Sequence, residues 1–161
     1  CSMILYHGSN LTISQIDLSK GNPNKYFGKG FYLTENKTHA EQIAKTRTLA
    51  FGGVPTINQF EFNEALLTNG ELKFKKFIGY TEEWARFVCE NRDNPNPNIS
   101  VHDFDVVYGP IANDNVGLQI RKYQNGDIDI KTFLERLKYM KGITYQFFFG
   151  TELAISKLHK L

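Results

Sequence analysis

The segment FGKGFYLT, Phe27–Thr34, decides the fold of this chain. Two glycines flank one lysine, and the residues that follow have the composition of a β-strand. The segment is neither a dinucleotide-binding G-x-G-x-x-G turn, which a helix would follow, nor a phosphate-binding loop, since Gly-Lys-Ser/Thr does not occur in the chain. Two readings stay open: a simple turn before a core strand, or a space beside Tyr32 in which its ring stacks on a flat heterocycle.

The residues after this segment predict a helix. Asn36 is a suitable N-cap, and Ala40, Ile43, Ala44 and Arg47 follow at helical spacing, with the first three forming an apolar face. Three more residues are predicted N-caps of later helices, the last of which would run to Lys160: Thr81, Asp129 and Thr151.

Other stretches alternate or cluster apolar residues as strands do: Met3–Tyr6, Val54–Asn63, Phe104–Tyr108 and Ile143–Phe149. We expect the first of them to enter a turn at His7-Gly8-Ser9 and the third to stop at Gly109-Pro110. A loop rich in Gly, Pro and Asn is expected from Ser19 to Lys25. Strands and helices do not alternate regularly, so the predicted fold class is α+β.

Composition and charge limit the class of protein. With 161 residues the chain is long enough for one domain, which we expect over residues 3–161 because Met3 has the character of a native start. A net charge of +2 gives no strongly basic field, which neither requires nor excludes a nucleic-acid substrate. No apolar run is long enough to cross a membrane, and a cytoplasmic location fits best.

Cysteine and histidine usage predicts no metal site and no disulfide framework. Cys89 falls in a helical pattern beside apolar residues, where a buried small hydrophobe is expected. His39, His102 and His159 share no metal-ligand spacing, and no cysteine joins them.

Two further segments carry groups that can bind a ligand. His7 lies at the end of a strand, where it can hydrogen-bond a ligand hydroxyl, and Gly8 lets a ligand approach the backbone closely. Gln146 lies among aromatic residues in an apolar strand, so its amide needs a partner. Each residue also has a structural explanation, which for Gln146 is a hydrogen bond to a neighbouring loop.

Taken in order, a strand-end His, a Tyr after Gly-x-Gly and a polar residue in a late strand resemble one branch of the ADP-ribosyltransferases. This is the diphtheria-toxin-like and poly(ADP-ribose)-polymerase-like branch, known by a His-Tyr-Glu triad. The whole chain is also similar to a bacterial family of formerly unknown function in the same clan. The matching segments are LYHGS (Leu5–Ser9), FGKGFYLT, FEFN (Phe60–Asn63), DVVYGPIAND (Asp105–Asp114) and YQFFFGTELAI (Tyr145–Ile155).

The resemblance implies a split β-sandwich, flanked by helices, with an NAD⁺-binding cleft between two small sheets. His7 would hydrogen-bond a hydroxyl of the nicotinamide-side ribose, Gly8 would hold the carboxamide, and Tyr32 would stack on the nicotinamide ring. The loop from Ser19 to Tyr26 would cover the dinucleotide. The full set of NAD⁺-binding residues implied in this way is His7, Gly8, Ser9, Tyr26, Gly30, Tyr32 and Thr34.

The chain departs from the family pattern at the catalytic glutamate, where it has Gln146. A glutamine can accept a hydrogen bond from a ribose hydroxyl but offers no full negative charge. The departure favours transfer of a single ADP-ribose, with His7, Tyr32 and Gln146 as catalytic residues. Glu152 is the competing carboxylate, although its place at a predicted helix start has a complete explanation in the helix dipole.

The expected function is therefore mono-ADP-ribosyltransferase, with NAD⁺ as co-substrate and no metal. A non-catalytic NAD⁺-binding module and an NAD⁺ glycohydrolase stay open as alternatives. The acceptor is a protein, a nucleic acid or a small molecule, which the sequence does not distinguish. A toxin or defence effector would need a neutralising antitoxin-like partner.

Overall fold

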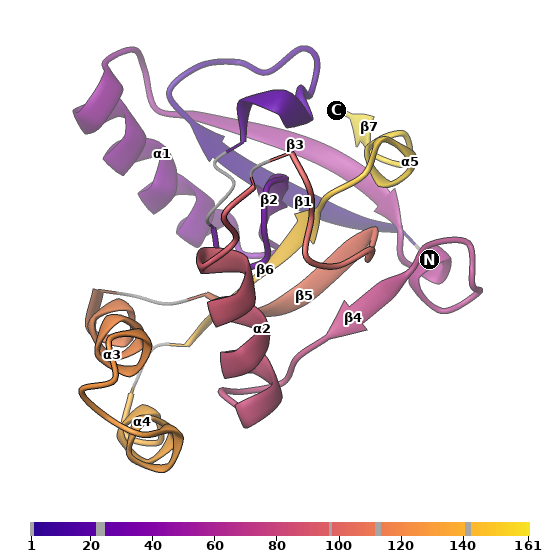
Figure 1. Cartoon of the computed structure of the whole chain (residues 1–161). Coiled ribbons are helices and arrows are strands. Elements are labelled where there is room, and N and C mark those ends of the chain that lie inside the picture. The colour runs from indigo at the N-terminus through magenta and orange to yellow at the C-terminus, as the bar shows by residue number, and fades with distance from the viewer. Residues whose placement is uncertain (1, 22–24, 97, 112–113, 141–142) are drawn as a thin grey trace.

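The computed structural model describes residues 2–21, 25–96, 98–111, 114–140 and 143–161. Within these ranges the fold is α+β, as predicted, with two sheets and five α-helices (Figure 1). The first sheet has the order β1-β3-β7, with bounds Ser2–Ser9, Thr56–Asn63 and His159–Lys160. The second has the order β2-β6-β5-β4, with bounds Phe31–Leu33, Thr144–Phe149, Val106–Ile111 and Phe74–Lys76.

Within the described residues, backbone pairing joins the two sheets at one bridge, between Tyr6 of β1 and Thr34, which directly follows β2. The Tyr6 N–H donates to the Thr34 carbonyl at 2.8 Å, and the Thr34 N–H donates to the Tyr6 carbonyl at 2.9 Å. This bridge is isolated, so the strands separate on either side of it. The divergence of β1 and β2 opens the space in which the candidate site lies.

The helices are α1 (Lys37–Phe51), α2 (Glu82–Arg92), α3 (Asp114–Gln124), α4 (Ile130–Leu137) and the short α5 (Glu152–Ile155). The predicted N-caps Asn36, Thr81 and Asp129 are confirmed, since each side chain accepts a hydrogen bond from the backbone N–H three residues on. In Figure 1, α1 lies beside the long strands β1 and β3, whereas α3 and α4 pair with one another below it.

Three elements end at residues other than those predicted, and the strands predicted from Val54 and Phe104 begin at Thr56 and Val106. Strand β1 continues through Ser9, because His7, Gly8 and Ser9 pair with β3 residues instead of turning. Strand β5 continues through Gly109 and Pro110, which pair with β6. The helix that begins after Thr151 ends at Ile155, and the segment His159–Lys160 pairs with β3 as a strand.

Pro110 has no N–H, but the sheet tolerates it because no carbonyl of β4 lies opposite its nitrogen. Tyr108 accepts from Phe77 on the β4 side, and backbone groups two residues apart point to the same edge. Pro110 therefore faces the β4 side, where the pairing of β4 ends at Tyr108. Its carbonyl on that side accepts a hydrogen bond from Trp84 Nε1 at 3.0 Å.

The aromatic strand β6 separates two hydrophobic clusters. Phe147 and Phe149 pack with Phe31, Phe60 and other residues that fill the space between the two sheets. Phe148 packs on the opposite side, in the cluster that buries α2, α3 and α4 against the second sheet. Gln146 shares the face of Phe148, as the alternation along β6 predicts.

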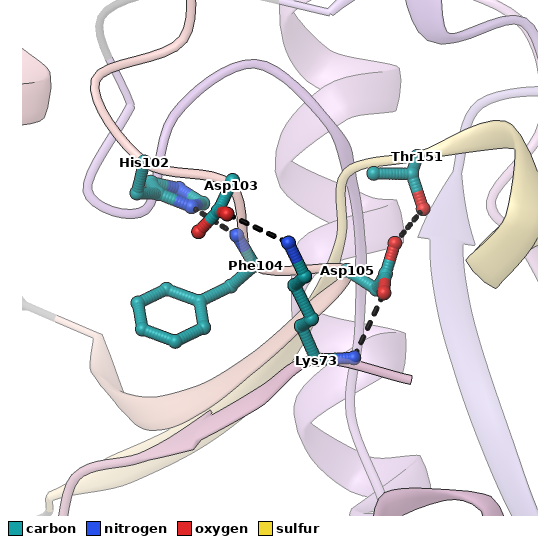
Figure 2. Close-up of polar contacts among 6 residues, drawn as sticks. All are labelled: Lys73, His102, Asp103, Phe104, Asp105 and Thr151. Atoms are coloured by element: carbon teal, nitrogen blue, oxygen red, sulfur yellow. Dashed lines mark hydrogen bonds and ion pairs between the residues drawn. The ribbon is translucent and has the colours of Figure 1, made fainter. Parts of the chain in front are cut away.

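A buried carboxylate ties the end of β6 to β4 (Figure 2). Asp105 accepts a hydrogen bond from the Lys73 backbone N–H at 2.8 Å and another from Thr151 Oγ1 at 2.6 Å. The neighbouring Asp103 instead forms an exposed ion pair with Lys73 Nζ at 2.8 Å. Asp105 thus fixes the position at which β6, the strand that carries Gln146, ends.

Candidate functional site

A pocket of about 260 Å³ lies where β1 and β2 separate. Six of the residues predicted from the sequence line it together: His7, Gly8, Tyr26, Tyr32, Thr34 and Gln146. These residues come from β1, β2, β6 and the segments next to β2, and so from widely separated parts of the chain.

His7 is held as a neutral imidazole. Its Nδ1 lies 2.7 Å from the Tyr32 carbonyl oxygen, which can only accept, so Nδ1 carries the proton. The ring stacks on Phe31 with 4.1 Å between centroids. Burial lowers the pKa of His7 to about 4, so at neutral pH Nε2 has a free lone pair. His7 therefore presents a hydrogen-bond acceptor.

Tyr32 offers its ring to the pocket, because its hydroxyl is already used. The hydroxyl donates to the Gly28 carbonyl at 2.6 Å and accepts from the Phe27 N–H at 3.1 Å. Burial raises the pKa of Tyr32 far above its ordinary value, so the phenol stays protonated. On the far side of this turn, His102 Nε2 donates to the Phe27 carbonyl at 2.7 Å.

Gly8 presents backbone groups toward the pocket. The backbone of Tyr6 bonds Thr34 on the β2 side of β1, and Gly8, two residues on, faces the same edge. Because the bridge to β2 is isolated, no strand residue pairs with Gly8 on that edge within the described chain. One N–H and one C=O of Gly8 are thereby placed as a donor and an acceptor for a planar amide.

Gln146 binds the helix α1 rather than a loop. Its Nε2 lies 3.0 Å from His39 Nε2, and because an amide nitrogen only donates, His39 must accept there. Burial lowers the pKa of His39, which agrees with a neutral ring. The contact orients the Gln146 side chain, which is 8% exposed, so that Oε1 is its remaining acceptor.

A comparison with protein-family models matched residues 3–160 to the family described as "Protein of unknown function (DUF3990)". The chain belongs to the DUF3990 family. The matched range includes every residue of the pocket. A search of curated proteins and a search of solved structures found no match.

Two basic residues of this DUF3990 chain line the pocket and were missed from the sequence: Lys25 and Arg47. Arg47 lies on α1 seven residues after Ala40, so its helical spacing already placed it on the face that packs against the sheet. No comparable signal marks Lys25, which lies before strand β2 (Phe31–Leu33). Residues 22–24 of the predicted covering loop lie outside the described residues.

Three other predicted residues do not line the pocket. Ser9 is buried, and its Oγ accepts from the Leu11 N–H at 3.4 Å. Gly30 is needed for packing, since a Cβ there would lie 2.3 Å from a Phe148 ring carbon. Glu152 is exposed in the first turn of α5, as its helix-dipole explanation predicts.

The described part of the DUF3990 chain has two other hollows of note. One, of about 320 Å³, lies beside His102, and the other, of about 520 Å³, lies beside Tyr108. Neither contains His7, Tyr32 or Gln146. We take the pocket where β1 and β2 separate as the candidate site, because titratable, aromatic and free backbone groups converge there.

Among the described residues, no helix combines the length and apolar character needed to cross a bilayer. The same residues contain no group of three or more His, Cys, Asp or Glu arranged to hold a metal ion. Cys89 is half-buried against the core, and burial raises the pKa of its thiol to about 11.

Proposed function

We propose that this protein is a mono-ADP-ribosyltransferase that cleaves the nicotinamide–ribose bond of NAD⁺ in the pocket where β1 and β2 separate. The observation that carries the proposal is the convergence of His7, Tyr32 and Gln146 on one pocket from three different strands. The roles of these residues come from the resemblance to the His-Tyr-Glu branch of the ADP-ribosyltransferases. The same resemblance implies a split β-sandwich fold.

The pocket suits the nicotinamide riboside end of NAD⁺. The N–H and C=O of Gly8 match the carboxamide, which has one acceptor and a donor pair. His7 Nε2 accepts a hydrogen bond from a ribose hydroxyl, and the Tyr32 ring supplies a flat surface for the nicotinamide. The roles of His7 and Gly8 use atoms that no other strand or side chain engages among the described residues, whereas the Tyr32 ring carries the Lys25 ammonium, 5.0 Å from its centroid.

The reaction breaks the bond between ribose C1′ and the nicotinamide nitrogen. The bond electrons leave with nicotinamide, which becomes neutral, while positive charge develops on the ribose. A nucleophilic oxygen or nitrogen of the acceptor then bonds to C1′ and releases its proton. Gln146 Oε1 accepts from a ribose hydroxyl and places a partial negative charge near the developing cation.

A second candidate function follows from one observation, which is the amide at the position of the family glutamate. Without a carboxylate, the same pocket would suit an NAD⁺-binding module that does not turn over. Hydrolysis of NAD⁺ to free ADP-ribose is a third outcome, which differs from transfer in having water as the acceptor.

The test is incubation of the protein with NAD⁺ labelled in the adenylate part, together with a cell extract. Transfer predicts released nicotinamide and label in a protein, nucleic-acid or small-molecule fraction, all lost in His7→Ala. Free ADP-ribose alone would favour hydrolysis, and calorimetric binding without nicotinamide release would favour the binding module. Absence of both binding and release would reject the proposed function.

A further inference from the structure

The pocket contains cationic groups that the roles of His7, Tyr32 and Gln146 do not use. Lys25 and Arg47 both line it, and no Asp or Glu does among the residues that the structure describes. Among the described residues, neither of the two forms an ion pair with a carboxylate. Each of these side chains is exposed enough to meet a ligand from solvent, so they lie at the rim.

The two charges act on the same space. Partial desolvation lowers the pKa of Lys25, and the nearby Arg47 lowers it further. After the larger effect of burial, both cations also help to lower the pKa of His7. The pocket therefore has a positive field at its rim, with no described carboxylate paired to either cation, and a ligand anion would be bound there in preference to a neutral group.

The size of the pocket places the anion at the mouth. Its volume of about 260 Å³ is just below the range of roughly 300–1,000 Å³ that is usual for ligand pockets. Its lining includes the apolar residues Leu33, Ile43 and Ile111, which are less exposed than Lys25 and Arg47. The pocket thus holds one aromatic half of a larger ligand, while the charged middle of that ligand crosses the rim.

Lys25 also occupies the ring that a nicotinamide would contact. Its Nζ lies over the Tyr32 ring, 5.0 Å from the centroid, in a cation–π contact. The nicotinamide of NAD⁺ is itself cationic, and two cations do not share one ring face. Stacking of nicotinamide on Tyr32 therefore requires the ammonium to move, and a nearby ligand anion would give it a new partner.

We propose that Lys25 and Arg47 form the subsite for the diphosphate of the dinucleotide, and that Lys25 moves from the Tyr32 ring to the diphosphate on binding. The assignment rests on the proposed function, which it deepens. Arginine can bind phosphate oxygens through two donors, and the lysine ammonium adds a point charge.

The experiment compares Lys25→Gln and Arg47→Gln by calorimetry with four probes: NAD⁺, ADP-ribose, inorganic pyrophosphate and nicotinamide riboside. Both variants should bind ADP-ribose and inorganic pyrophosphate about tenfold more weakly, the loss expected for one charge-assisted contact. NAD⁺ should show the same loss with Arg47→Gln and a smaller one with Lys25→Gln, where the cleared Tyr32 ring offsets part of it. The affinity of both variants for these probes should also depend less on salt concentration than that of the unchanged chain. Nicotinamide riboside should bind Arg47→Gln unchanged and Lys25→Gln more tightly, because the ring face is then clear.

The matched control is Lys45→Gln, which removes an exposed lysine of α1 that does not line the pocket. It should bind all four probes as the unchanged chain does, and thermal melting should show that each variant is folded. Unchanged ADP-ribose binding in Lys25→Gln and Arg47→Gln would overturn the subsite, even if nicotinamide is released. Weakened diphosphate binding without any nicotinamide release would keep the subsite and reject the transferase. Binding of none of the probes would reject both.

Discussion

Replacing Gln146 by Glu tests whether this strand position faces the ribose carbon at which NAD⁺ is cleaved. The substitution keeps the length of the side chain and adds a full negative charge. Hydrogen bonds to charged groups contribute roughly 1.5–3 kcal/mol and neutral ones about 0.5–1.5 kcal/mol. The difference of about 1–2 kcal/mol, if it acts on the developing cation, corresponds to roughly five- to thirtyfold faster cleavage.

The contact with His39 sets the pH range in which this gain should appear. Gln146 Nε2 lies 3.0 Å from His39 Nε2, and burial keeps the pKa of His39 low in the unchanged chain. A carboxylate at that distance would raise the pKa of His39, because it favours the imidazolium form. A protonated His39 would neutralise the new charge, whereas a neutral His39 would leave it to act on the ribose.

We therefore expect the gain from Gln146→Glu to be small near about pH 6 and largest above about pH 8, on either side of the ordinary histidine pKa. In the double variant Gln146→Glu, His39→Gln, the gain should no longer depend on pH in this range. The assay is nicotinamide release from saturating NAD⁺, measured by chromatography.

Glu152→Gln is the control, since it removes an exposed carboxylate that does not line the pocket. It should leave the rate unchanged. A Gln146→Glu variant that melts like the unchanged chain, yet releases nicotinamide no more than twofold faster at any pH, would refute the placement of Gln146 beside the reacting carbon.

Three further predictions concern stability. His7 binds a proton more weakly in the folded chain, with a pKa of about 4 against an ordinary 6.5, so stability falls as the pH drops below the ordinary value. When the pH falls from 7 to 5, the free energy of unfolding measured with urea should decrease by about 2 kcal/mol more in the unchanged chain than in His7→Gln. Equal decreases in the two proteins would contradict a buried neutral ring. Asp105→Ala should lower the free energy of unfolding by about 1–3 kcal/mol, because the Lys73 N–H loses its acceptor. Asp103→Ala, which breaks only an exposed and solvent-screened ion pair, should shift the melting temperature much less, and equal thermal shifts for the two would count against the buried network. Gly8→Ala should unfold the chain at a much lower temperature, because a Cβ at Gly8 would lie 2.1 Å from the Ala40 carbonyl oxygen of α1. The control is Gly117→Ala in α3, where an added Cβ would lie 3.6 Å from its nearest neighbour, the Tyr26 hydroxyl. This change should raise the free energy of unfolding by about 0.5–1 kcal/mol. Similar melting of the two variants would refute the close packing of α1 on β1.

The sequence by itself determined the local structure. The caps Asn36, Thr81 and Asp129 act within three residues, so their helices start where the pattern predicts. The apolar run Ile143–Phe149 predicted strand β6, and its alternation placed Gln146 on the face of Phe148. These signals depend on neighbours along the chain, and a single sequence contains them in full.

The tertiary structure decided what depends on pairing between distant segments. His7 lies in a strand and not in a turn because β3, some fifty residues later, pairs with it through Asn58. The available edge of Gly8 exists because the bridge between Tyr6 and Thr34 does not continue. His39 contacts Gln146, and Lys25 and Arg47 line the same pocket, although these residues belong to different segments of the chain. The order of the segments along the chain does not show how close they lie in the folded protein. Local propensity cannot specify such contacts, because they form only when whole sheets and helices pack together.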